Sequence, residues 1–233
     1  MNISAGFAPL QGLNAIRHLL FAQTDAGTRP GLDELLRQQM ADDTMVDWSP
    51  KLGGVLPMPF GGHRLTATEG RMLDNLSVQR GVIGLNTFRG IQEQALGVAQ
   101  TRIGQGIVDG HGDAFRHAFW SARLTQAFGA DWARAFTNAH EANPGNTAGA
   151  EAMDLHNNSV GIRIAQAHPH ADEAELGRLI EQALDNGEMV VINRAGNLAW
   201  SDDVARGSTG RDRLGAATGT LALPDPYTPA RGY

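Results

Sequence analysis

Histidines and acidic residues gather in three short stretches of the sequence, and these residue types are the ones that activate water. The stretches are GDAFRHAFWSA at 112–122, AHE at 139–141 and MDLHNNSVG at 153–161. Imidazole and carboxylate groups move protons near neutral pH and bind divalent metals, whereas amide and guanidinium groups hold oxyanions. Each stretch alone is a weak signal, but together they predict one polar site on helices.

The first stretch pairs a carboxylate with an imidazole. Asp113 and His117 are four residues apart, so they share a face of a helix, with Trp120 on the same stripe and Arg116 on the next. A carboxylate beside an imidazole fixes its tautomer and raises its basicity, which suits a general base or a metal ligand. The alternative is that Asp113 only caps the helix and His117 is a satisfied interface histidine.

The second stretch places His140 and Glu141 at the end of a helix whose apolar side carries Trp132 and Phe136. A partly buried His-Glu pair beside a Gly/Asn loop suits acid/base chemistry or metal binding. The alternative is that the histidine is a cation that satisfies the last carbonyls of the helix.

In the third stretch Asp154 and Asn158 share a helical face, whereas His156 points the opposite way because two residues are about 200° of turn. Asparagines are poor interior residues of helices, so Asn157 and Asn158 require specific partners. Those partners belong either to the site or to a buried polar network that fixes the packing of the helices.

The apolar periodicity predicts the elements that carry these stretches. A capping-box pattern at Thr66 and Glu69 starts a helix that ends near Ser77. Asp113 and Asp131 are predicted N-caps of the two helices that follow later. The other predicted helices cover about 10–20, 32–40, 85–100, 150–167 and 173–185, and a hairpin covers 188–192 and 197–200.

These elements predict a mostly α, multi-helix globular domain with a small C-terminal β-hairpin and an irregular tail. The Gly- and Pro-rich run at 48–62 indicates a linker or ordered arm rather than a regular element. We therefore expect an N-terminal helical arm and linker at 1–62, a helical catalytic domain at 63–204 and an irregular tail at 205–233.

Composition limits the functional classes. The 233 residues carry a formal charge of -6, which disfavours extended nucleic-acid binding, and contain no cysteine, which excludes thiolate ligands and nucleophiles. Residues 1–23 lack the features of a signal peptide and no run of 18 apolar residues occurs, so we expect no transmembrane segment. Export would then need a specialised secretion system or a larger parent chain.

The three motifs, in this order and spacing, resemble a bacterial domain family found in secreted and Rhs-type polymorphic toxins, and LTATEGRMLDNL at 65–76 looks like its helical lead-in. The resemblance covers about residues 65–165. It implies an antibacterial effector delivered to a competing cell, together with an immunity protein and a secretion adaptor or chaperone as partners. Such domains usually end a long carrier chain, whereas this chain is short. The characteristic polar positions are Asp113, Arg116, His117, His140, Glu141, Asp154, Asn157 and Asn158.

The leading hypothesis is a hydrolase of the cell envelope, cutting peptidoglycan or phospholipid in the periplasm of the target cell. The predicted catalytic residues are His117, His140, Glu141 and Asp154, and the predicted substrate-binding residues are Arg116, Trp120, Asn157 and Asn158.

Two versions of the chemistry stay open. In the metal version His117, His140 and Asp154 bind a divalent ion such as zinc, and Glu141 is the general base. In the metal-free version Glu141 is a general acid assisted by Asp154 or a water. The competing functions are a non-enzymatic secretion or immunity-binding module with a structural polar network, and a metal-dependent nuclease.

Overall fold

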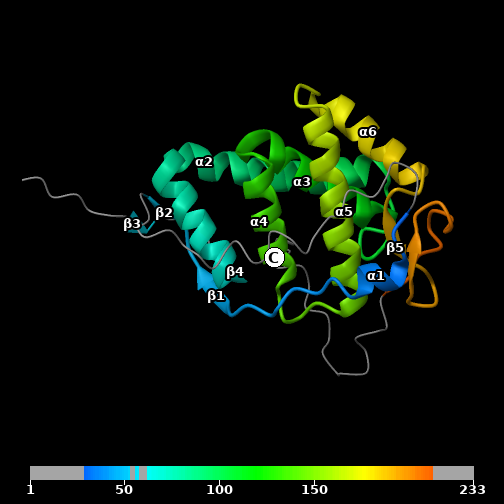
Figure 1. The fold of residues 1–233 in the computed structure, drawn as a ribbon. Coiled ribbons are helices and arrows are strands. Elements are labelled where there is room, and N and C mark those ends of the chain that lie inside the picture. The colour runs from blue at the N-terminus through cyan, green and yellow to red at the C-terminus, as the bar shows by residue number, and fades with distance from the viewer. Residues whose placement is uncertain (1–28, 53–55, 58–61, 212–233) are drawn as a thin grey trace, which may run out of the picture. The chain divides into compact units, whose positions relative to one another are not determined.

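The computed structural model describes residues 29–52, 56–57 and 62–211. The chain divides into two compact units, residues 1–31 and 32–233, and every element described here belongs to the second. Within the described residues this unit is mostly α-helical and ends in a small antiparallel hairpin (Figure 1). The prediction of a mostly α fold with a C-terminal hairpin is confirmed.

The elements follow one another along the chain with short connections. The helices are α1 (Leu32–Leu36), α2 (Ala67–Arg102), α3 (His111–Phe128), α4 (Ala130–Glu141), α5 (Ala148–Ala167) and α6 (Glu173–Asp185). The strands form three antiparallel pairs: β1 (Met45–Trp48) with β4 (His63–Thr66), β2 (Lys51–Leu52) with β3 (Leu56–Pro57), and β5 (Val190–Ile192) with β6 (Leu198–Trp200).

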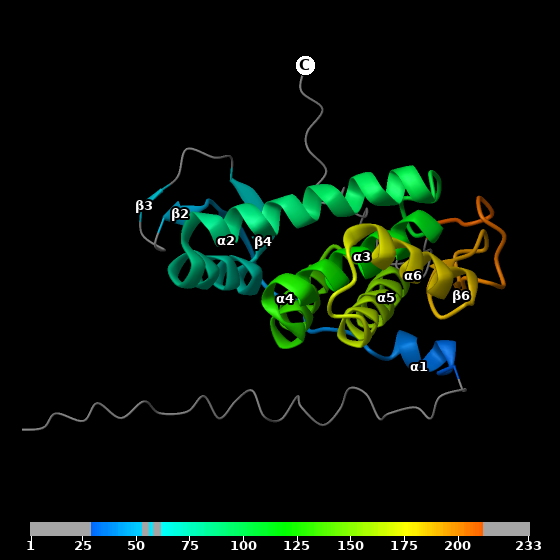
Figure 2. The same ribbon diagram turned by 90° about the horizontal axis from the view of Figure 1, so that it is seen from above.

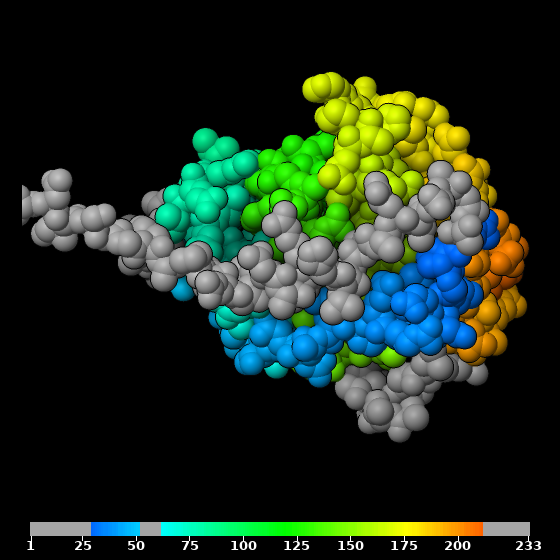
Figure 3. Space-filling view, viewed as in Figure 1, coloured from blue at the N-terminus to red at the C-terminus, as the bar shows by residue number. Residues whose placement is uncertain are grey.

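Helix α3 is the centre of the bundle, because it packs against α2, α4, α5 and α6. Its Phe115 and Phe119 are fully buried, as are Phe136 of α4, Met153 of α5 and Ile180 of α6. Figure 2 shows α2 running along one side of helices α3 to α6. In Figure 3 the segment from α1 to β1, in blue, lies across the lower part of the bundle. A side chain on the inner face of α3 is therefore held from several directions.

Helix α2 combines two predicted helices. Its N-terminal capping box is confirmed, since the Thr66 side chain accepts from the Glu69 N–H and the Glu69 side chain accepts from the Thr66 N–H. The predicted end near Ser77 is wrong, because the Ser77 hydroxyl donates to the Lys51 carbonyl and the helix continues. The break comes instead at Gly81, whose φ of 61° is a backbone conformation that glycine adopts without strain.

The Gly- and Pro-rich run is partly regular, whereas the sequence predicted a linker or ordered arm without a regular element. Strand pairing between β1 and β4 orders both ends of the run, and the buried Trp48 indole donates to Asp74 of α2. The helix predicted over 32–40 stops at Leu36. The helix predicted over 10–20 lies outside the described residues, and the three-part division of the chain stays a prediction.

Two predicted N-caps are wrong by a few positions. Helix α3 starts at His111 with Gly110 as its N-cap, and Asp113 lies in the first turn, where its side chain accepts from the Asp109 N–H. Asp131 likewise lies in the first turn of α4, after Gly129. A carboxylate in the first turn interacts favourably with the positive end of the helix dipole, as a carboxylate at the N-cap does. The sequence pattern alone therefore does not distinguish an N-cap aspartate from a first-turn aspartate.

Helices α3 and α5 approach each other closely at Gly161. A Cβ at this position would overlap the carbonyl oxygen of Ala118 in α3. Ser121 of α3 ties the helices together there, since its hydroxyl donates to the Asn158 carbonyl at 2.9 Å. This close approach brings the polar residues of α5 against those of α3.

We predict that Gly161→Ala lowers the free energy of unfolding by about 1–3 kcal/mol, because the added methyl forces α3 and α5 apart. Urea denaturation measures this change. Gly97→Ala is the matched control: it lies on an exposed face of α2 with open space around it, so it should be neutral or stabilise by up to about 1 kcal/mol. Equal stability of Gly161→Ala and wild type would contradict the packing argument.

Candidate functional site

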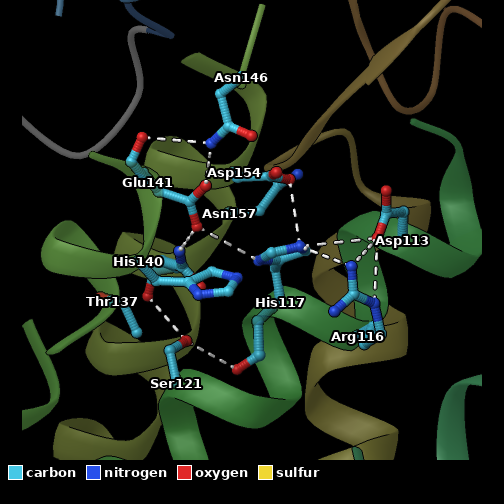
Figure 4. Close-up of polar contacts among 12 residues, drawn as sticks. Asp113, Arg116, His117, Ser121, Thr137, His140, Glu141, Asn146, Asp154 and Asn157 are labelled. Carbon is cyan, nitrogen blue, oxygen red and sulfur yellow. Dashed lines mark hydrogen bonds and ion pairs between the residues drawn. The ribbon is translucent and has the colours of Figure 1, made fainter. Parts of the chain in front are cut away.

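The polar residues of α3, α4 and α5 meet around the imidazole of His117 (Figure 4). The side chain of His117 is only 3% exposed. Its two ring nitrogens face different groups, Asp113, Arg116 and Asp154 on one side and Glu141 on the other. The ring therefore lies at the centre of this group of polar residues; the catalytic role predicted for it stays a prediction.

On the Nε2 side, a guanidinium and two carboxylates surround the ring. Arg116 Nη2 donates to His117 Nε2 at 2.9 Å and to Asp113 Oδ1 at 2.6 Å. The Oδ1 atoms of Asp113 and Asp154 lie 3.6 Å and 3.4 Å from the same Nε2. Because Nε2 accepts a hydrogen bond, the neutral ring carries its hydrogen on Nδ1.

On the Nδ1 side, the partner is Glu141, whose Oε1 lies 3.7 Å away. Asn158 Nδ2 donates to that oxygen at 3.1 Å, and Asn146 Nδ2 donates to the other carboxylate oxygen at 3.2 Å. Two amides thus fix the carboxylate that faces the Nδ1–H of His117. At this separation, which is longer than a hydrogen bond, the carboxylate faces the imidazole without holding it.

Burial shifts the proton affinities of the three central groups. It holds the pKa of His117 well below its ordinary value, with the Arg116 guanidinium and His140 adding to the effect. Burial raises the pKa of Glu141 to about 7. Burial, and next the negative charges of Glu141 and Asp113, raise the pKa of Asp154 well above its usual range. Each shift favours the uncharged form of its group, so the buried centre favours a neutral imidazole and protonated forms of Glu141 and Asp154.

Several buried polar atoms of the site have no hydrogen-bond partner among the described residues. They are Asp154 Oδ1, His117 Nδ1, Trp120 Nε1 and Asn158 Oδ1. Native proteins pair nearly all buried polar atoms, so such a group of atoms in one place indicates a site made for something else to bind. Trp120 belongs to this site through its ring, which lies 6.4 Å from the His117 ring and 5.3 Å from that of His140.

His140 has a different partner from the one the sequence predicted. Its Nδ1 donates to Glu69 Oε1 at 2.9 Å, and the other oxygen of Glu69 accepts from the Thr66 N–H. The groups that come together as possible metal ligands are Asp113, His117 and Asp154, within 4.8 Å of one another. Asp113 therefore takes the place that we had given to His140.

Glu69 is the residue of this region that sequence reasoning missed. It was assigned only to the capping box, which uses one of its two oxygens. The second oxygen is buried with the rest of the side chain and accepts from His140 Nδ1. No local pattern indicated that it would reach the end of α4, 71 residues later.

The remaining residues of the third motif lie as helix geometry requires. His156 points away from the site, where its Nε2 donates to the Glu188 carbonyl, as predicted. Asn157 is not gathered into the site either: its amide donates to the Val190 carbonyl and accepts from the Val190 N–H. It fastens strand β5 to α5, and no contact supports the predicted substrate-binding role.

Comparison with known proteins finds one similar domain family and no activity. The family model described as a domain of unknown function (DUF6973) matches residues 77–188, which include all three polar motifs. No curated protein and no solved structure matches the chain significantly. Among the described helices, none has both the length and the apolar character that a membrane crossing needs.

Glu151, one turn before Asp154, is a buried carboxyl outside the central group. It is 7% exposed, and its side chain accepts from the Met40 N–H. Burial raises its pKa to about 7, and the charge of Asp42 adds to the shift. On the side of the polar site, the charge of Glu151 acts on Glu141. A carboxyl whose pKa rises on folding stabilises the fold below its unfolded pKa of about 4.3, and this stabilisation is lost as pH rises through 7.

We predict that Glu151→Gln, which keeps the acceptor for Met40, raises stability at about pH 8 more than at about pH 5. After allowance for solvent screening the difference should be about 1 kcal/mol, or roughly 2–4 °C in melting temperature. Thermal unfolding at both pH values measures it. Glu93→Gln, at an exposed position, is the control, and it should change the melting temperature equally at both pH values. If Glu151→Gln also has the same effect at both, burial of this carboxyl does not contribute to stability.

Proposed function

We propose that this chain is a hydrolase that acts on the bacterial cell envelope, on peptidoglycan or phospholipid, as an effector delivered to a competing cell. The observation that carries the hydrolase proposal is the setting of His117. Its Nδ1 faces Glu141 at 3.7 Å, while Nε2 faces Asp154 at 3.4 Å and Asp113 at 3.6 Å. A buried imidazole with carboxylates facing both of its ring nitrogens is an arrangement that can activate water.

Hydrolysis at this site takes one of two forms. In acid/base form, Nε2 removes a proton from the water that attacks the scissile bond and returns it to the leaving group as that bond breaks. In metal form, Nε2 and the aspartates hold an ion that makes the bound water more acidic. In both forms the Arg116 guanidinium, 20% exposed, is the cation available to a developing oxyanion.

The choice of substrate class rests on two other observations. The order of the three motifs resembles that of secreted and Rhs-type polymorphic toxins, and the matched domain of unknown function spans the same motifs. The formal charge of -6 provides no broad basic surface for DNA or RNA. These observations favour an envelope substrate over a nucleic acid.

We predict that the purified protein releases soluble fragments from peptidoglycan sacculi or fatty acids or headgroups from phospholipid vesicles. His117→Gln and Glu141→Gln should lower the rate roughly 100-fold or more, because each removes half of the imidazole–carboxylate pair. Chromatography of the soluble products measures both activities. His156→Gln is the matched control, since this histidine points away from the site and its variant should keep the wild-type rate.

Two results would contradict this proposal. Degradation of DNA or RNA, with no release from either envelope substrate, would favour the nuclease alternative. Equal rates for wild type and a folded His117→Gln variant would show that the polar network only fixes the packing of the helices.

We further predict that the protein is toxic to bacteria when a signal peptide directs it to the periplasm, and not when it stays in the cytoplasm. The reason is that its proposed substrates are reached from the periplasm. Growth curves of cells that express each form measure this effect, with His117→Gln as the inactive control and His156→Gln as the active one. Toxicity confined to the cytoplasm would contradict an envelope substrate.

A further inference from the structure

Two hydrogen-bond acceptors face each other in the buried centre of the site. His117 Nε2 accepts from Arg116 with its one lone pair, so it carries no hydrogen that a neighbouring carboxylate could accept. Asp154 Oδ1, 3.4 Å from it, is buried and accepts no hydrogen bond from any described residue. Asp113 Oδ1 lies 3.6 Å from the same nitrogen. Lone pairs that converge in a buried place repel one another unless a cation lies between them.

We propose that Asp113 Oδ1, His117 Nε2 and Asp154 Oδ1 bind one divalent metal ion. Its role as the water-activating cofactor rests on the function proposed above, whereas the binding itself does not. The ligands of a tetrahedral ion, with bonds of about 2.0–2.2 Å, lie roughly 3.3–3.5 Å apart. The distances from Nε2 to the two carboxylate oxygens, 3.4 Å and 3.6 Å, are close to this separation and longer than hydrogen bonds.

In the structure described here, the Arg116 guanidinium contacts two of the atoms that would bind the metal ion. Its Nη2 lies 2.6 Å from Asp113 Oδ1 and 2.9 Å from His117 Nε2, two of the three proposed ligand atoms. The ion and the guanidinium therefore compete for the same lone pairs. The Arg116 side chain is 20% exposed and that of Asp154 is 14% exposed, so this edge of the site is the one that solvent reaches. Binding of the ion would displace Arg116 Nη2 from these two atoms.

The donor set favours zinc or manganese. One imidazole with two carboxylates suits these ions, whereas calcium takes six to eight oxygen ligands. Glu141 faces the other ring nitrogen, Nδ1, at 3.7 Å, which is the side from which a carboxylate orients a histidine ligand in carboxylate–histidine–metal arrangements. The site therefore holds three ligand groups and a carboxylate on the far side of the central one.

The experiment is calorimetric titration of the untagged, chelator-treated full chain with Zn²⁺ and with Mn²⁺. We expect one ion of at least one of these metals per chain, and at least about tenfold weaker binding by Asp154→Asn. His156→Gln is the control on the same helix. His168→Gln with His170→Gln is the control for ion binding by the exposed histidines after α5. Both controls should bind as wild type does.

The Arg116→Met variant tests whether the guanidinium competes with the metal ion, whereas Asp154→Asn tests the loss of a ligand. It keeps much of the length of the side chain but removes the competing charge, so we expect the ion to bind roughly tenfold more tightly. A folded Arg116→Met variant that binds more weakly than wild type would overturn the exchange of guanidinium for metal.

A measurement on the wild-type chain avoids dependence on variants that fail to fold. Mn²⁺ in the site should broaden the indole N–H resonance of Trp120 before those of the other tryptophans, because its ring lies 6.4 Å from that of His117. Absence of binding by wild type, unchanged binding by Asp154→Asn, or early broadening elsewhere would overturn the proposal. A proton on Asp154 would then be what joins the two acceptors. Metal binding without hydrolysis would leave this site standing and remove only the proposed activity.

Discussion

The close contact between α3 and α5 is the physical constraint on which the polar site depends. Gly161 leaves no side chain between the helices, and the Ala118 carbonyl fills that space. Ser121 then joins the two backbones through the Asn158 carbonyl. His117 directly precedes Ala118 in α3, and the same approach leaves its Nε2 3.4 Å from Asp154 Oδ1. A larger residue at 161 would separate the groups that give the site its chemistry.

Burying so much charge is costly, and the structure limits the cost by fixing each group. Glu141 is held by two asparagine amides, Asp113 by Arg116 and by the Asp109 N–H, and His140 by Glu69. The exceptions are concentrated at the centre, where Asp154 Oδ1 and His117 Nδ1 accept or donate no hydrogen bond to a described residue. An unsatisfied centre within fixed surroundings is the arrangement expected of a binding site, whereas every member of a packing network should be satisfied.

The sequence predicted the helices and the hairpin well where neighbouring residues determine them. The Thr66 and Glu69 capping box, the helices of the three motifs and the C-terminal hairpin follow from side-chain chemistry within a few residues. The exceptions also have physical causes. The strands around the Gly- and Pro-rich run form by pairing across it, and α2 continues past Ser77 because that hydroxyl has a distant partner.

For the site, the sequence by itself determined which side chains of one helix share a face. The four-residue spacing places Asp113 beside His117, and the two-residue spacing turns His156 away from Asp154. Only the tertiary structure decided which residues of different helices meet: His117 with Asp154 and Glu141, His140 with Glu69, and Asn157 with the backbone of Val190. Helical periodicity gives the direction of a side chain about its own axis. The distance to another helix depends on how small residues such as Gly161 let the helices pack, which no local pattern encodes.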